Sequence, residues 1–209
     1  MIEFFAIIEV FSPLIPIAIY LRKAIRNRWL FILLCYCFVY ILLAIYANYI
    51  PTTGHSNILR YLIIAIFSFI AFSLLIDAFI AKKTFTLISR ILIIVIILFS
   101  VVNFRRWEDT SAYNSNSSAL ASIILIIYCI YYFKLQLVQI KNVFIERQPS
   151  FWIVAGIFLY CGANFFVFAF YRPLTLQYKD FAHSVWYFYD IIILLMNIFF
   201  AKGITCVKK

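Results

Sequence analysis

Long apolar runs, each close to twenty residues, follow one another along the chain and are separated by short polar or charged stretches. The apolar residues within a run are continuous and do not alternate with period two, which argues against the strands of a transmembrane barrel. A helix needs about 20 residues to cross a bilayer. The pattern therefore predicts an all-α integral membrane protein, a seven-transmembrane-helix bundle with spans over residues 3–21, 29–50, 58–81, 86–104, 119–140, 151–171 and 184–202.

Composition supports a lipid environment. Of the 209 residues, 67% are hydrophobic and 12% are charged, against roughly 45–50% and about 25% in an average soluble domain. Seven helices use about 140 residues and leave about 70 for all the loops and both ends. We therefore expect residues 1–209 to form a single membrane domain, without a separate soluble catalytic or nucleic-acid-binding domain.

Lys and Arg are distributed unevenly between the two sets of loops. Thirteen of the 18 basic residues fall in or beside the loops after the first, third, fifth and seventh spans, and five fall elsewhere. With the acidic residues included, the two sides carry +11 and −1. Cytoplasmic loops are enriched in Lys and Arg, so the N-terminus is predicted outside and the C-terminus in the cytoplasm. The net charge of +10 is then a topology signal, and we expect no nucleic-acid partner.

Three polar side chains fall inside the predicted spans at one depth. Glu9, Asn164 and Asp190 each lie about seven residues from the outer end of a span, which places them about 10 Å below the outer surface. Ionisable groups are costly in lipid and often mark functional sites. If the first, sixth and seventh spans are neighbours, these residues form a polar pocket that opens outward.

Neighbouring residues share the helix faces of this pocket. Tyr187 precedes Asp190 by three positions and follows Trp186, and Tyr160 precedes Asn164 by four. Aromatic rings of this kind are suited to walling a cationic or amphipathic ligand. The candidate ligand-binding residues are Glu9, Tyr160, Asn164, Trp186, Tyr187 and Asp190. The alternative is that these polar residues only join the helices.

Two features modify the pocket hypothesis. Pro13 and Pro16 should bend the first span just beyond Glu9 and free backbone carbonyls. Facing carboxylates of Glu9 and Asp190 would need a shared proton or a bound cation to relieve their repulsion. Arg60, near the outer end of the third span, is the alternative counter-charge, and such an ion pair would make the site structural.

The cytoplasmic end of the fifth span suggests a second surface. Phe133, Leu137, Ile140 and Phe144 follow helical spacing, while Lys134 and Lys141 lie between them. We expect the helix to extend as an amphipathic segment until Pro149 ends it. Such a segment either lies in the headgroup region or docks a soluble partner; the candidate partner-binding residues are Lys134, Leu137, Lys141 and Phe144.

Enzyme and cofactor signatures are absent from the sequence. There is no zinc-binding His-Glu-x-x-His motif, phosphate-binding glycine loop or nucleophile elbow, and the two histidines are His55 and His183. The seventh span has no central lysine, which a retinal Schiff base would require. We therefore expect no catalytic residues, no cofactor and no metal site.

One short stretch resembles a known family. The segment Gln148-Pro149-Ser150-Phe151-Trp152-Ile153, followed by Gly156, resembles the Pro-x-Phe-Trp-Ile-x-x-Gly segment of small seven-helix membrane proteins of Bacteroidota, whose genes often sit beside sensor histidine kinases. Gln148 stands where Asn is usual in that family. The resemblance is sharp over about twenty residues and implies a bacterial inner (cytoplasmic) membrane protein with a signalling association, for which a kinase or another membrane subunit is the expected partner. It assigns no ligand.

These observations favour a receptor-like sensor module in which the outward pocket detects a small ligand, a cation or a protonation change. A small-solute or proton-coupled transporter using the same acids is the alternative, as is a structural subunit of a membrane complex. The residues after Asn197 are Ile198, Phe199, Phe200 and Ala201, and this apolar inner half favours sensing over transport.

Overall fold

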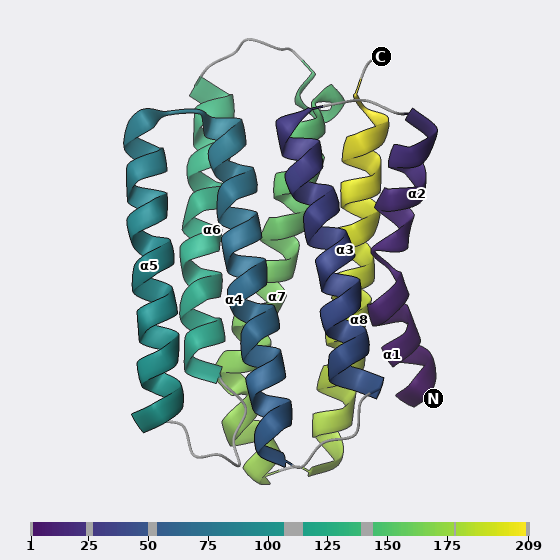
Figure 1. Ribbon diagram of the computed structural model, residues 1–209, viewed down its shortest axis with the longest axis vertical. Coiled ribbons are helices and arrows are strands. Elements are labelled where there is room, and N and C mark those ends of the chain that lie inside the picture. Colours follow the sequence, from purple (N-terminus) through teal and green to yellow (C-terminus); the bar gives the residue numbers. More distant parts are fainter. Residues whose placement is uncertain are drawn as a thin grey trace.

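The computed structural model describes residues 2–23, 27–49, 54–106, 115–138, 144–177 and 179–207, and all regular structure in these ranges is helical (Figure 1). The elements in chain order are α1 (Ile2–Phe11), α2 (Leu14–Lys23), α3 (Arg28–Tyr49), α4 (Gly54–Ile80), α5 (Lys83–Arg106), α6 (Ser115–Val138), the short 3-10 helix η1 (Ile145–Arg147), α7 (Pro149–Gln177) and α8 (Lys179–Thr205).

Six of the described helices, α3 to α8, are long and apolar enough to cross a membrane. Their apolar segments are Arg28–Ala47, Leu59–Ile80, Lys83–Phe104, Asn116–Val138, Pro149–Ala169 and Val185–Thr205. They coincide with the last six apolar runs of the sequence to within a few residues. This confirms an all-helical integral membrane protein.

The first apolar run is a broken helix. α1 ends at Phe11 and α2 begins at Leu14, with Ser12 and Pro13 in a turn between them. Pro13 has no N–H to continue the ladder of α1. Pro16 is tolerated because it lies in the first turn of α2, where N–H groups have no acceptor within the helix. The bend predicted at these prolines is thus a complete break, and two ten-residue helices occupy the first apolar run over residues 3–21.

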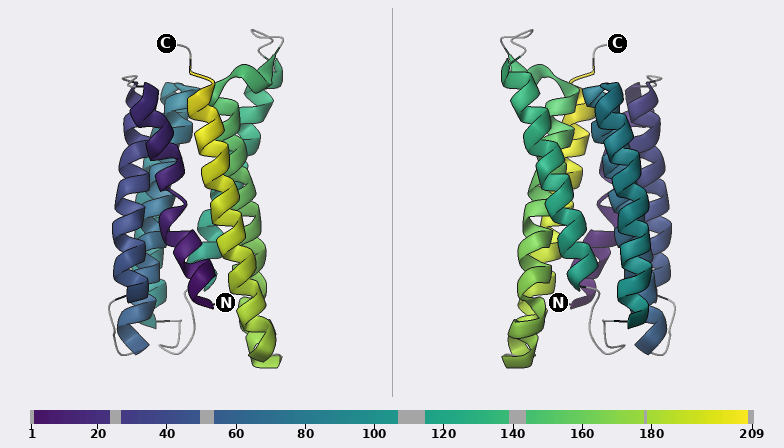
Figure 2. Two further views of the ribbon diagram at one scale, coloured as in Figure 1. Left: turned by 90° about the vertical axis from the view of Figure 1, so that its right-hand side faces the viewer. Right: turned by 90° about the vertical axis from the view of Figure 1, so that its left-hand side faces the viewer.

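The helices form a closed bundle in which α3 to α8 each pack against the next helix in the chain. The α1–α2 pair packs against both α3 and α8 and so closes the bundle (Figure 1). The views in Figure 2 show the pair crossing the bundle obliquely, with the two chain ends at opposite ends of the molecule. The Glu9 helix and the Asp190 helix are thus neighbours.

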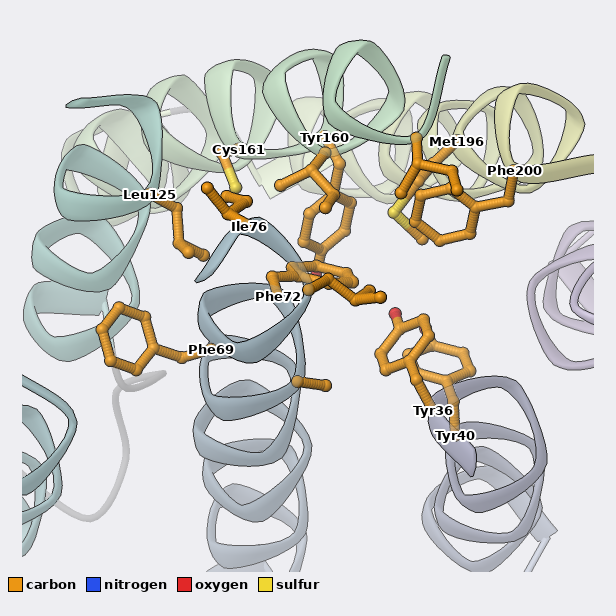
Figure 3. Close-up of a cluster of buried hydrophobic side chains, with 14 of the residues drawn as sticks. Tyr36, Tyr40, Phe69, Phe72, Ile76, Leu125, Tyr160, Cys161, Met196 and Phe200 are labelled. Atoms are coloured by element: carbon orange, nitrogen blue, oxygen red, sulfur yellow. The ribbon is translucent and has the colours of Figure 1, made fainter. Parts of the chain in front are cut away.

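Aromatic side chains fill the centre of the bundle (Figure 3). The Tyr36 ring lies 4.7 Å from the Phe72 ring and 6.3 Å from the Phe200 ring, measured between centroids. Phe72 also meets Tyr160 of α7 at 5.7 Å. These residues are almost completely buried. They form a packed aromatic cluster that joins α3, α4, α7 and α8.

Two glycines let α7 and α8 approach each other closely. A Cβ atom at Gly156 would lie 2.9 Å from the Cβ of Phe199, and one at Gly203 would lie 2.8 Å from the Cγ1 of Ile153. Real Cβ atoms do not approach so near, so each position requires glycine. Small residues have this role in membrane helix pairs because close backbone packing replaces the hydrophobic effect there.

Candidate functional site

Glu9 lies in the last turn of α1 and is 8% exposed. Its Oε1 accepts a hydrogen bond from the Tyr40 hydroxyl of α3 at 2.9 Å. A carboxylate removed from water is costly unless it is hydrogen-bonded or paired, and Tyr40 supplies a neutral donor. The site thus begins with a carboxylate that is held by a phenol of a neighbouring helix.

Asp190 of α8 brings a second carboxylate to the same region. It is also 8% exposed, and it is close enough to Glu9 for the two carboxylates to interact electrostatically. Both acids are therefore buried on two helices, α1 and α8, that pack against each other. Two like charges in a low-dielectric interior repel each other strongly, so the arrangement favours a shared proton or a bound cation.

The helix break connects this acidic pair to the middle of α8. Asn197 Nδ2 donates to Ser12 Oγ at 2.9 Å and to the Ile193 carbonyl at 3.0 Å. Ser12 Oγ in turn donates to the Glu9 carbonyl at 3.3 Å. The turn at Ser12 and Pro13 is therefore tied to α8 about one helical turn from Glu9 and two helical turns from Asp190. A movement of Glu9 would therefore be passed to the non-helical turn between α1 and α2.

Tyrosine side chains of α7 and α8 form the next part of the site. The hydroxyls of Tyr160 and Tyr189 lie 3.0 Å apart, and either can be the donor. Tyr160 is also close enough to interact electrostatically with Glu9. Trp186 packs against Tyr189 at 5.8 Å and against Tyr61 of α4 at 6.2 Å. Tyr160 and Trp186 thus pack against aromatic neighbours in this part of the bundle, and Trp186 and Tyr187 are both partly buried.

Asn164 lies in an adjoining cavity. Together with Tyr160, Ser68 and Ser122 it lines a space of about 20 Å³ between α4, α6 and α7, which is room for about one water molecule. Among the described residues, Asn164 Oδ1 and Ser68 Oγ are buried without a hydrogen-bond partner. Tyr160 therefore lines this cavity and also pairs through its hydroxyl with Tyr189 of α8.

Arg60 has a structural contact at the end of α3. Its Nη1 donates to the Tyr46 carbonyl at 2.9 Å, and its guanidinium lies 4.2 Å from the centre of the Tyr46 ring. The last carbonyls of a helix have no partner within the helix, and Arg60 satisfies them here. This position explains why an arginine that is 3% exposed is accommodated in the bundle.

The segment after α6 differs from the expected amphipathic extension. α6 ends at Val138, and Phe144, with φ −117° and ψ 85°, is not helical. One helix running to Pro149 is therefore wrong, because the chain must turn back to start α7. Leu137 and Phe144 are 68% and 50% exposed, and the Lys134 side chain is also exposed. Lys141 lies outside the described residues.

Several residues of the site have no distinctive signal in the sequence. Ser12, Tyr40 and Tyr189 contact the acids or their neighbours, but Tyr40 and Tyr189 are two of 15 tyrosines and nothing in their spacing distinguishes them. Ser12 has one usable signal, since it directly precedes Pro13 and a break places its hydroxyl near freed carbonyls. No protein-family model, curated protein or solved structure matches the chain.

Proposed function

We propose that the protein is a seven-pass sensor of the cytoplasmic membrane, with the N-terminus outside, in which protonation or cation binding at Glu9 and Asp190 controls the position of the broken first span. The observation that carries this proposal is the burial of two carboxylates on the packed helices α1 and α8, one of them three residues before a helix break. Buried ionisable groups inside a membrane bundle are typically functional because their cost must be offset.

The coupling follows from charge and from the break. With a proton or cation present, the acidic pair holds α1 against α8; without it, the two charges repel each other. The turn at Ser12 and Pro13 is the weakest point of the first span, so α1 can move there without unfolding a continuous helix. The hydrogen bond from Asn197 to Ser12 is then lost or exchanged.

A route to the opposite end of the bundle runs through α2. Lys23, the last residue of α2, donates through Nζ to the carbonyls of Thr205 and Val207 at the end of α8. Cys206 lies beside η1, with its Sγ 3.9 Å from the Glu146 carbonyl. Displacement of α2 thus reaches the segment that presents Phe144. Under this proposal the exposed side chains of Lys134, Leu137 and Phe144 contact a cytoplasmic signalling partner, such as a kinase, or another membrane subunit.

Infrared difference spectroscopy between acidic and alkaline buffers tests the acidic pair. We expect a protonated-carboxyl band in the native protein that Glu9→Gln or Asp190→Asn removes. Glu146→Gln is the matched control, because Glu146 is exposed on η1. Each variant is first shown to be folded by its elution and thermal unfolding. A band that persists unchanged in both single variants and in the double variant would contradict the proposal.

A proton-coupled carrier is the second candidate, and the broken helix favours it. Secondary transporters commonly place acids at discontinuous helices near the centre of the membrane. The packed rings of Tyr36, Phe72 and Phe200 oppose this function, because a solute moving toward the α2–α8 end would have to displace them. Proton flux into proteoliposomes that depends on Glu9 would establish carriage; carboxyl titration without flux would establish sensing.

A further inference from the structure

A groove of about 560 Å³ lies where α3 begins, α4 ends and α5 begins. These helix ends lie at the end of the bundle at which α2 and α8 finish (Figure 1). α4 and α5 are joined by a very short turn in which Ala81 has a positive φ of 50°. The first residues of α5 line the same groove as the first turn of α3. The groove is therefore shaped by the backbone and does not depend on a long loop.

The groove is cationic. Arg28, Lys83 and Arg90 line it with exposed side chains, and Asp77 is its single acid. The carboxylate of Asp77 accepts a hydrogen bond from the Thr86 hydroxyl at 2.7 Å, which occupies one of its oxygens. Arg28 and Lys83 are also the first residues of α3 and α5, where unpaired N–H groups attract anions. The chemistry suits a phosphate group.

The remaining lining is apolar and continues into the lipid-facing surface. Ile32, Leu74 and Leu87 come from three helices, and the last two are 39% and 61% exposed. Below Leu87, the outer face of α5 continues through Ile91 and Ile94, which are 52% and 59% exposed. A soluble anion would use only the basic rim of this groove. A molecule with a charged head and an alkyl tail would use both parts.

We propose that this groove binds an anionic phospholipid, with its phosphate among Arg28, Lys83 and Arg90 and an acyl chain along the outer face of α5. Three arguments support this occupant: the excess of positive charge, the apolar continuation on α5, and the position at an end of the apolar spans Arg28–Ala47 and Lys83–Phe104. Trp29 also lines the groove, and tryptophan prefers the headgroup level of a bilayer.

Lipid titration of the delipidated full-length protein tests the proposal. The probes are phosphatidylglycerol and phosphatidylcholine of identical acyl chains, added in detergent and followed by thermal unfolding and by native mass spectrometry. We expect tighter binding of phosphatidylglycerol, weakened about fivefold for each cation removed by Arg28→Gln, Lys83→Gln or Arg90→Gln. Arg90→Lys should retain most of the affinity, because it keeps the charge.

Matched controls separate the groove from general surface charge. Lys134→Gln and Arg147→Gln remove exposed cations at the same end of the bundle but outside the groove, and should leave the preference unchanged. Equal affinity for the two lipids, or equal loss in the control variants, would overturn the proposal. Equal thermal stabilisation by inorganic phosphate and by the lipid would also overturn it. So would the finding that the lipid-free protein is a dimer that the three groove variants dissociate.

Discussion

Tyr40 gives the buried carboxylate of Glu9 a hydrogen-bond donor that does not add charge to the bundle. Its neighbour Tyr36 lies one helical turn away and is equally buried, but its hydroxyl has no hydrogen-bond partner among the described residues. The two phenols therefore have the same burial and different bonding. Their comparison isolates the contribution of a single hydrogen bond to stability.

Tyr40→Phe should destabilise the protein by about 1–3 kcal/mol, because it leaves a buried acceptor without its donor. Tyr36→Phe should be neutral or slightly stabilising, since it removes a hydroxyl that no protein group satisfies. Thermal unfolding of both variants in the same detergent measures the difference. Equal destabilisation would show that Glu9 does not depend on Tyr40.

Scarcity of charge explains which site residues the sequence reveals. Glu9 and Asp190 are recognisable because acids are rare in apolar runs, and their depths are fixed by counting residues along helices. Tyr40 and Tyr189 are not recognisable, because their role depends on which helices are neighbours and on how each helix is rotated about its axis. Asn164 is recognisable as a polar residue, but only the packing of α7 against α4 and α6 places it in a separate cavity.

At the scale of the elements, the stretch from Pro149 to Gly156 has a direct structural role. Pro149 is the first residue of α7, where a proline costs no hydrogen bond. Trp152 Nε1 donates to the Glu146 carbonyl at 2.7 Å, and its ring packs 5.6 Å from the Phe199 ring of α8. Ile153 packs against Gly203. The segment that resembles a family motif thus forms one end of the α7–α8 interface.

Gly156→Ala and Gly203→Ala should each destabilise the protein by about 1–3 kcal/mol, because the added methyl group forces α7 and α8 apart. Gly162→Ala in α7 is the matched control, since nothing lies within 4 Å of its Cβ position. That variant should be neutral, or more stable by up to about 1 kcal/mol, because alanine favours helix. Thermal unfolding ranks the three variants; a loss at Gly162 equal to the other two would contradict the packing argument.

At the scale of the whole molecule, charge divides the bundle into two unlike ends. The described cations Arg22, Lys23, Arg28, Lys83 and Lys202 lie toward the end at which α2 and α8 finish (Figure 1). The N-terminus lies at the other end. Positive charge that remains on one side is the signal that orients membrane proteins. The asymmetry therefore predicts that this end is cytoplasmic.

Reagent accessibility in intact cells tests this orientation. Lys134 is exposed on α6 near the α2–α8 end, which is predicted to be cytoplasmic. In a background without native cysteines, Lys134→Cys should therefore be protected from a membrane-impermeant maleimide added outside the cells. Asn116→Cys, at the exposed start of α6 on the opposite end, should react. Reaction of the first variant and protection of the second would reverse the predicted topology.

The sequence by itself determined the membrane environment, the helical class and the approximate limits of six spans, because each depends only on local hydropathy and length. It also indicated the two acids. The prolines also indicated the bend of the first span. The tertiary structure decided that α1 and α2 close the bundle against α3 and α8, and that Tyr40 donates to Glu9. These features depend on contacts between residues that are distant in the chain, for which local hydropathy contains no information.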